Sequence, residues 1–354
     1  MRSHVLMPWG ALTVFVAVLT SPSLLGQTRA VGPTAAKNAP NASAWRPPRT
    51  PDDQPDLQGV WINNSATPLE RPPELAGKPF LTDGEIAELR QREDRLFKDQ
   101  DADFAGGDNF FLALLANPDH YKNPNATGGF DPTVERVLER RTSLIIDPPD
   151  GNIPWTPEGQ QRQAAAVAFA QHPGAAGPED LTNAMRCLTM GAPRLGGNYA
   201  VGQFGYYQIL QTAGYVLLNL EWIHEVRIIP LDGRPHLPET LRQWDGDSRG
   251  HWEGNTLVVD TTNFSPKSFF QGSSDRLHLV ERFTRVAPDR IDYQITVDDP
   301  TTWTKPWTAE IHLEHSDDQI YEVACHEGNL PVVGDILAGA RAQDKVPAEA
   351  SPTR

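Results

Sequence analysis

The stretch 252–264, WEGNTLVVDTTNF, decides the fold class of this chain. Gly254-Asn255 is a turn pair of the kind that joins the two strands of a hairpin. After the turn, Leu257 and Val259 alternate with polar residues, and this period of two is typical of a strand with one buried face. The stretch therefore predicts a hairpin at the centre of an antiparallel meander.

Similar strand patterns lie on both sides of this hairpin, separated by residues that favour turns. The expected strands are Tyr206–Thr212, Tyr215–Glu221 continuing through Ile229, Thr256–Asn263, Leu277–Arg285, Ile291–Val297, Trp307–His315 and Gln319–Cys325. Short strands at such regular spacing indicate a sandwich or an up-and-down barrel. With two more strands at Gly59-Val60-Trp61 and Arg141–Ile146, the prediction is mainly β, an antiparallel up-and-down barrel of the lipocalin-like kind.

The N-terminal half adds a few peripheral helices to this barrel. Thr82-Asp83-Gly84-Glu85 is a capping box, which predicts a helix from about Asp83 to Lys98. Thr156-Pro157 predicts a second helix, with Thr as the cap and Pro at the first position. We therefore expect a single barrel domain over 56–330, with a helical and irregular insertion over about 82–185.

The two ends of the chain have the composition of an exported protein. Residues 1–30 combine an early Arg2, an apolar run too short to span a bilayer and small residues that suit cleavage after Gly26 or Ala30. They predict a signal peptide, and a membrane anchor is the alternative. We expect a flexible linker over 31–55, a mobile tail over 331–354 and a soluble, periplasmic or secreted protein without membrane contact after signal removal.

Composition and motifs exclude several classes of function. The 354 residues have a formal net charge of −15 with no basic stretch to offset it, so we expect no nucleic-acid partner. The chain has no G-x-S-x-G, Walker or dinucleotide-type glycine motif, and its histidines lack the spacing of a metal site. We expect no cofactor, and the sequence predicts no metal site.

The two cysteines, Cys187 and Cys325, predict a disulfide, because an isolated pair in an exported protein is most simply oxidised. This disulfide would close a loop of well over a hundred residues, and the chain-entropy model gives such a loop roughly 4 kcal/mol of stabilisation. The alternative is Cys325 as a nucleophile beside His326, but adjacency in sequence does not supply the required geometry.

Two ionisable residues interrupt predicted apolar strand faces. Glu281 shares a face with Leu279 and Phe283, and His224 shares one with the apolar residues of 218–228. An acid and an imidazole inside a barrel suit ligand binding, or general acid–base catalysis with shifted pKa values. His224 and Glu281 are therefore the candidate catalytic pair.

Neighbouring residues leave a second interpretation of this interior open. Thr261 and Asn263 fall on the buried face of the central hairpin, where they add hydrogen bonds to a ligand. Alternatively, the buried carboxylate pairs with Arg227 or Arg282, and the buried imidazole is a satisfied core residue.

A second candidate site is the segment 244–254, WDGDSRGHWEG, which we expect to be a loop at the barrel mouth. Its candidate ligand-binding residues, together with Asn263 and Arg227 of the interior, are Asp245, Asp247, Arg249, His251 and Trp252. Aromatic rings beside carboxylates and a guanidinium suit a sugar or an aromatic acid. The segment does not match a calcium loop, because Arg249 stands where a third oxygen ligand is needed. The alternative is a long hairpin connection with solvated charges.

Several segments together resemble a family of exported bacterial proteins. They are PDLQGVW at 55–61, RTSLIIDPPDG at 141–151, IHEVRIIPLDGRPH at 223–236, GDSRGHWEGNTLVVDTTNF at 246–264, DDPTTWTKPWTAE at 298–310 and YEVACHEGN at 321–329. The resemblance implies export but no reaction, so it transfers no catalytic residue. A further resemblance to lipocalin-type barrels depends on Gly59-x-Trp61 and the meander, and concerns the fold only.

Three functions fit these predictions. The first is an exported β-barrel protein that binds a small organic ligand in or at the mouth of the barrel. The second is a hydrolase, lyase or isomerase on the same scaffold that uses His224 and Glu281. The third is an envelope-associated interaction module without a small-molecule site.

Overall fold

The computed structural model describes residues 45–98, 108–116, 137–171, 176–194, 205–221, 223, 225–268, 270–322 and 324–343. The chain divides into two compact units, Met1–Ala42 and Ser43–Arg354, and the described residues all belong to the second. The predicted signal peptide lies outside them. No helix within the described ranges is both long and apolar enough to cross a membrane.

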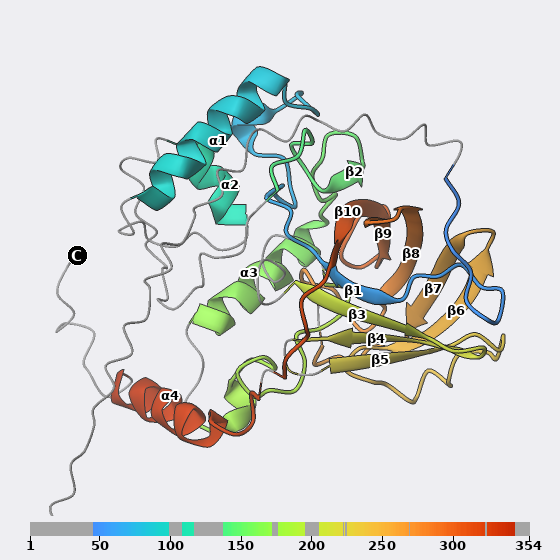
Figure 1. Cartoon of the computed structure of the whole chain (residues 1–354). Coiled ribbons are helices and arrows are strands. Elements are labelled where there is room, and N and C mark those ends of the chain that lie inside the picture. Colours follow the sequence, from blue (N-terminus) through green and yellow to red (C-terminus); the bar gives the residue numbers. More distant parts are fainter. Residues whose placement is uncertain are drawn as a thin grey trace, which may run out of the picture. The chain divides into compact units, whose positions relative to one another are not determined.

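The fold is mainly β, as predicted, and its centre is a ten-stranded antiparallel sheet (Figure 1). The strands of the described chain are β1 Gly59–Ile62, β2 Ile145–Asp147, β3 Tyr206–Gln211, β4 Tyr215–Leu220, β5 Glu225–Pro230, β6 Asp247–Glu253, β7 Thr256–Thr262, β8 His278–Ala287, β9 Arg290–Asp298 and β10 Trp307–Ser316. Their order across the sheet is β5-β4-β3-β1-β10-β9-β8-β7-β6, and β2 pairs beside β10.

The sheet is not closed into a barrel by strand pairing. β5 and β6 are its two ends, and no backbone pairing joins them in the described residues. The sheet nevertheless curls until these ends meet through side chains. Gly250 of β6 lies so close to β5 that a Cβ added there would be 2.7 Å from Ile229 Cγ2. The closed barrel that we predict from strand spacing is therefore not confirmed.

The concave side of the curled sheet holds the core. On β9, Ile291, Ile295 and Val297 are completely buried, and on β10 the alternate residues from Trp307 to Leu313 are buried as well. The alternation of apolar and polar residues in these two strands predicts the same buried faces, because residues two apart on a strand point to the same side, and the structure confirms them.

The predicted continuation of β4 through β5 is wrong. The chain reverses at Ile223, which has φ 62°, and the two strands pair antiparallel. The reversal changes which residues of β5 face the core. Arg227 lies opposite Leu218 and is buried, whereas Val226 and Ile228 are 49% and 59% exposed.

Two further segments differ from expectation. Most of 244–254, which we expect to be a loop, is strand β6 paired with β7. The strand predicted over Gln319–Cys325 is absent from the described residues of that segment. Tyr321, which alternation along that strand would place on the buried face, is 69% exposed. Val323 lies outside the described residues.

Four α-helices and two short 3-10 helices accompany the sheet in the described residues. They are α1 Asp83–Lys98, α2 Asp108–Leu115, α3 Pro157–Gln171 and α4 Asn329–Gln343, with 3-10 turns at Pro73–Leu75 and Pro178–Asp180. The capping box at α1 is confirmed, because Glu85 N donates to Thr82 Oγ1 at 3.3 Å and Thr82 N donates to Glu85 Oε2 at 2.8 Å. α2 falls in a region that we expect to be irregular, and α4 occupies the beginning of the expected tail.

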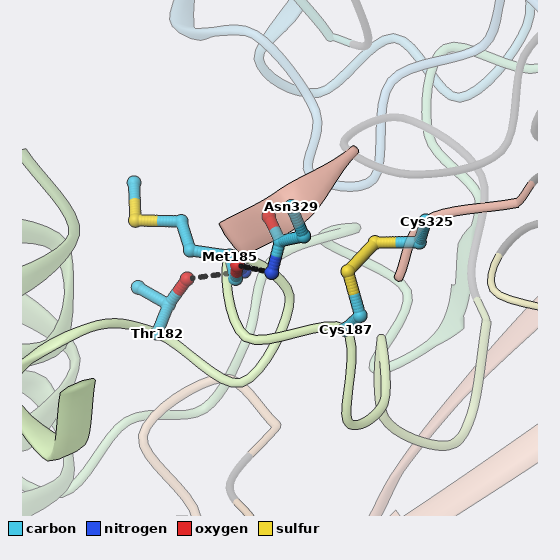
Figure 2. Close-up of a disulfide and its surroundings, with 5 residues drawn as sticks. All are labelled: Thr182, Met185, Cys187, Cys325 and Asn329. Carbon is cyan, nitrogen blue, oxygen red and sulfur yellow. Dashed lines mark hydrogen bonds between the residues drawn. A yellow bond between two sulfur atoms is a disulfide. The ribbon is translucent and has the colours of Figure 1, made fainter. Parts of the chain in front are cut away.

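The predicted disulfide joins Cys187 to Cys325, with the two Cα atoms 5.8 Å apart (Figure 2). Close to it, Asn329 Nδ2 donates to the carbonyl oxygen of Met185 at 2.9 Å, and Met185 N donates to Thr182 Oγ1 at 3.2 Å. The disulfide and the Asn329 hydrogen bond attach the beginning of α4 and the chain before it to the segment 182–194, which reaches the site described next.

Candidate functional site

An ion pair inside the curled sheet joins β5 to β8. Arg227 donates to Glu281 twice, from Nη1 to Oε1 at 3.0 Å and from Nη2 to Oε2 at 2.6 Å. Arg227 Nη2 also donates to Ser248 Oγ at 3.1 Å and to Thr261 Oγ1 at 3.2 Å, and Tyr293 Oη donates to Glu281 Oε1. The side chains of Arg227 and Glu281 are 7% and 0% exposed. Because water is excluded, each charge depends on the other.

The electrostatics agree with a fixed ion pair. Burial alone lowers the pKa of Arg227, but the charge of Glu281 outweighs it and holds that pKa above its ordinary value. Burial, and then the charge of Glu281, raise the pKa of Tyr293. Glu281 is therefore buried as predicted, with Arg227 as its partner, and this pairing was one of the two interpretations of the sequence. His224, the other half of the predicted catalytic pair, lies outside the described residues.

A small cavity lies beside this ion pair. It is lined by Gly191, Ala192, Arg194, Tyr207, Leu218, Leu220, Arg227 and Tyr293. The volume open to the centre of a water molecule is about 10 Å³, which is room for about one water. Pockets for organic ligands usually measure several hundred Å³. The cavity therefore accommodates one polar group and not a whole ligand.

A pair of carboxyl groups, Glu225 at the beginning of β5 and Asp245 just before β6, lies beside Arg194, which lines this cavity. Glu225 Oε2 accepts from Arg194 Nη2 at 2.9 Å and from Met190 N at 3.3 Å. Thr189 Oγ1 donates to Asp245 Oδ1 at 2.6 Å and lies 3.3 Å from Glu225 Oε2. One hydroxyl group thus lies within hydrogen-bonding distance of both carboxyl groups.

The segment before Arg194 is folded around this carboxyl pair. Gly191 N donates to Thr189 Oγ1 at 2.7 Å, which orients the hydroxyl toward the carboxyl groups. Tyr207 Oη of β3 donates to the carbonyl oxygen of Arg194 at 2.9 Å and anchors the segment to the sheet. Cys187 lies two residues before Thr189, so the disulfide tethers the same segment from its other end.

The surroundings of Asp245 disfavour its negative charge. Burial, followed by the nearby charge of Glu225, raises the pKa of Asp245 to about 6. The hydrogen bond from Thr189 and the charges of Arg227 and Arg194 act in the opposite direction but do not compensate. Asp245 therefore changes its protonation state close to neutral pH, where a carboxyl group is useful for ligand binding or catalysis.

Several buried polar atoms of this cluster lack hydrogen-bond partners, and the Nε atom of Arg194, whose Nη2 pairs with Glu225, is one of them. Neither Glu225 Oε1, an acceptor, nor Arg227 Nε, a donor, has a hydrogen-bond partner among the described residues. The side chains that carry them are 8% and 7% exposed. Because buried polar groups are nearly always hydrogen-bonded, such atoms mark a place where a water or a ligand group completes the structure.

The other predicted ligand-binding residues lie in a separate network on β6 and β7. Asp247 accepts from Arg249 Nη1 at 2.6 Å, from Leu237 N at 2.8 Å, and pairs with His236 Nδ1 at 3.0 Å. His236 Nε2 lies 2.8 Å from Asp260 Oδ1. Arg249 and Asp247 are thus engaged with each other, and they fix the chain that leads into β6.

His251, Trp252 and Asn263 contribute to the surface and the fold. His251 is exposed, with its Nε2 3.2 Å from Glu253 Oε1. Trp252 packs against the core, and Asn263 Nδ2 donates to the carbonyl oxygen of Leu237 at 2.8 Å. None of the three lines the interior cavity.

The sequence did not identify four members of this cluster: Thr189, Arg194, Tyr207 and Glu225. Glu225 was accessible to sequence reasoning, since Glu-x-Arg places two charges on one face of a strand. Thr189 and Arg194 come from irregular chain, where no periodic pattern indicates direction. No group of three or more His, Cys, Asp or Glu that would hold a metal occurs among the described residues.

Comparisons with protein-family models, curated proteins and solved structures give no match for this chain. The resemblance to exported bacterial proteins therefore stays a prediction, and the site's own geometry is the basis for a functional proposal.

Proposed function

We propose that the protein binds a small organic molecule by seating one polar group of it against Glu225, Asp245 and the cavity beside Arg227. The observation that carries this proposal is the pair of buried atoms without partners, Glu225 Oε1 and Arg227 Nε. A polar group that replaces a water there gains hydrogen bonds that the free protein leaves unmade.

The size of the cavity determines how such a ligand is held. About 10 Å³ admits a single polar group, so the remainder of the ligand lies outside the cavity. Asp245 is only half-buried and provides the approach from solvent. This proposal corresponds to ligand binding at the mouth of the curled sheet and not within its core, which apolar side chains fill.

A thermal-shift screen of the mature protein tests the proposal. The library contains neutral sugars, aromatic acids, alcohols and amines of low molecular weight. We expect at least one class to raise the melting temperature of the wild type. The increase should be lost in Glu225→Gln and Asp245→Asn but kept in Asp317→Asn, a matched loss of one charge at a side chain that is 103% exposed. Stabilisation that all three variants retain would place the ligand elsewhere, and no stabilisation by any class would refute the proposal.

A second function, acid–base catalysis, is favoured by one specific observation. The pKa of Asp245 is raised to about 6, and a general acid is most effective when its pKa lies near the pH at which the enzyme works. Asp245 would then take the role that the sequence assigns to Glu281.

Proton NMR of each stabilising compound, incubated with the protein, separates an enzyme from a binder. Conversion of more than one equivalent of compound, lost in Asp245→Asn and dependent on a group that titrates near pH 6, indicates catalysis. Compounds that bind and stay unchanged indicate a binding protein.

We also propose that the protein is exported, with residues 1–30 as the signal peptide. The Cys187–Cys325 disulfide supports this, because disulfides persist mainly in oxidising compartments. Mass spectrometry of protein recovered from a periplasmic fraction should give a chain that begins after Gly26 or Ala30. Full-length protein confined to the cytoplasm would contradict it.

A further inference from the structure

We infer that the group seated in the cavity beside Arg227 is an oxygen that accepts hydrogen bonds, as in a carbonyl or carboxylate group, because Arg227 lines the cavity and its Nε lacks an acceptor among the described residues. The inference rests on the proposed function and specifies the chemical class of its ligand.

The polar side chains in the wall of the cavity are guanidinium and hydroxyl groups. They belong to Arg194, Tyr207, Arg227 and Tyr293. The remaining lining residues are glycine, alanine and leucine, and no carboxyl group is among the described residues of the wall. Glu225 and Glu281 pair with the two arginines without lining the cavity themselves. The side chains that a ligand atom meets inside are therefore hydrogen-bond donors and aliphatic groups.

Arg227 provides the N–H group that lacks an acceptor. Its Nη1 and Nη2 atoms donate to Glu281, Ser248 and Thr261. Its Nε has no hydrogen-bond partner among the described residues, and its side chain is only 7% exposed. A guanidinium group keeps its protons and has no lone pair to offer, so only an acceptor completes this Nε. Because a buried donor without an acceptor is unfavourable, a ligand oxygen that reaches it gains affinity.

The two tyrosine hydroxyl groups do not compete with Arg227 for this acceptor. Tyr207 Oη donates to the carbonyl oxygen of Arg194 at 2.9 Å, and Tyr293 Oη donates to Glu281 Oε1. Each hydroxyl group has a single proton, so both protons are already in use. Arg227 Nε is therefore the donor that an incoming oxygen meets.

Other groups fit this wall less well. A protonated amine has no lone pair for Arg227 Nε and brings a positive charge close to that guanidinium group. A hydroxyl group accepts from Nε, but its own proton then needs an acceptor, and the tyrosine oxygens are the only side-chain acceptors among the described lining residues. A carbonyl or carboxylate oxygen has lone pairs and no proton, and the cavity of about 10 Å³ has room for one such atom.

Four probes of nearly the same shape test the inference: benzamide, benzoate, benzyl alcohol and benzylamine. Isothermal titration calorimetry at pH 7.5 should show that benzamide or benzoate binds about tenfold or more tightly than the other two, because only these two bring a carbonyl or carboxylate oxygen to the buried donor. Tighter binding of benzamide identifies a neutral carbonyl group, and tighter binding of benzoate identifies a carboxylate. Benzyl alcohol or benzylamine that binds as tightly as the better of these two overturns the inference.

Two double variants assign the effect to Arg227. Arg227→Met with Glu281→Leu removes the guanidinium group together with its carboxylate partner, so that neither charge is left buried alone. It should weaken binding of the better probe about tenfold. Arg282→Gln with Glu253→Gln removes an arginine–glutamate pair whose side chains are 37% and 51% exposed, and it should leave the affinity unchanged. Circular dichroism of each variant establishes that the fold is intact.

NMR of the arginine Nε–Hε groups gives a second measurement that uses only the wild type. The Hε signal of Arg227 should move downfield when the better probe binds, because a new hydrogen bond deshields the proton. The Hε signal of Arg282, on the outer surface, should stay where it is. An Arg227 signal that does not move at a saturating concentration of probe overturns the inference, whatever the double variants do.

The outcomes separate this inference from the proposed function. If benzylamine or benzyl alcohol binds best and Glu225→Gln weakens that binding, the site is real and the inference is wrong. If no probe binds, the compounds that stabilise the protein in the thermal-shift screen replace the probes, and compounds without a carbonyl or carboxylate oxygen overturn the inference. If no compound of that library binds either, the proposed function fails, and the inference fails with it.

Discussion

Replacing Asp245 with asparagine should stabilise the fold at neutral pH, because the native site holds this carboxyl group where its charge is unfavourable. Its pKa is raised from the ordinary 3.8 to about 6 by burial and by Glu225. Well below pH 3.8 the group is protonated in both the folded and the unfolded state. Between pH 4 and 6 the unfolded state loses its proton first, so the stability of the wild type falls, and the loss is complete above pH 6.

The magnitude follows from the size of the shift. A shift of about two units corresponds to about 3 kcal/mol. Because Asp245 keeps partial access to solvent, we expect about 1–2 kcal/mol of this to be regained in Asp245→Asn at pH 7.5, and about a fifth of that gain at pH 4. Asparagine retains a side-chain oxygen that accepts the Thr189 hydroxyl proton, so the hydrogen bond at this position is preserved.

Urea unfolding of both proteins at pH 7.5 and at pH 4 measures this difference. A variant that is less stable than the wild type at both pH values, or that is changed equally at both, would refute the reasoning. A gain in stability together with a loss of ligand binding is what a residue retained for function should show.

Three further predictions concern the scaffold. Glu281→Gln should lower the free energy of unfolding by about 3–5 kcal/mol, because it leaves the Arg227 charge buried without a partner. The double variant Arg227→Met with Glu281→Leu should lose far less of this free energy, and urea unfolding measures both. The pKa of His278 is raised from 6.5, chiefly by its hydrogen bond to a carboxylate of β7 and despite burial. The bond between His278 and Asp260 therefore stabilises the fold fully below pH 6.5, and this stabilisation is lost as the pH rises through the higher pKa of the folded state. His278→Gln should flatten this part of the plot of melting temperature against pH, and an unaltered plot would contradict the prediction. Replacing Cys187 and Cys325 together with serine should cost about 4–5 kcal/mol in urea unfolding, since the bridge closes a loop with a sequence separation of 138, and a cost below about 1 kcal/mol would show that the segment is held without it.

The sequence predicted most of the sheet because alternation is a local signal. Leu257 and Val259 identified β7, and the same rule identified the buried faces of β9 and β10. The disulfide was predicted because the chain has two cysteines and is expected to be exported to an oxidising compartment. These predictions needed no knowledge of how distant segments meet.

The strand assignments were wrong where the structure of a segment depends on which strands pair with it and not on its own residue pattern. β6 was predicted to be a loop because it lacks β-branched residues; it lies at the end of the sheet, where only β7 pairs with it. The reversal at Ile223 could not be read from a run that has apolar residues on both faces, so alternation placed Val226 and Ile228 on the buried face, where the structure instead has Arg227. A single inserted turn inverts the direction of every later side chain on the strand.

The candidate site was predicted only in part, since it is assembled from segments far apart in the sequence. The sequence analysis named Asp245 and Arg227 as candidate ligand-binding residues. Thr189, which lies within hydrogen-bonding distance of both carboxyl groups, is 36 residues from Glu225 and 56 residues from Asp245. Contacts of this kind follow from tertiary folding and have no local pattern.

The most direct test of the account is a carbon-13 NMR titration of the aspartate carboxyl groups from pH 3 to pH 8, with Asp245→Asn used to assign the signal. Our account predicts that one aspartate, absent from the variant, titrates at about pH 6. An Asp245 signal that titrates near the ordinary value of 3.8 would contradict it.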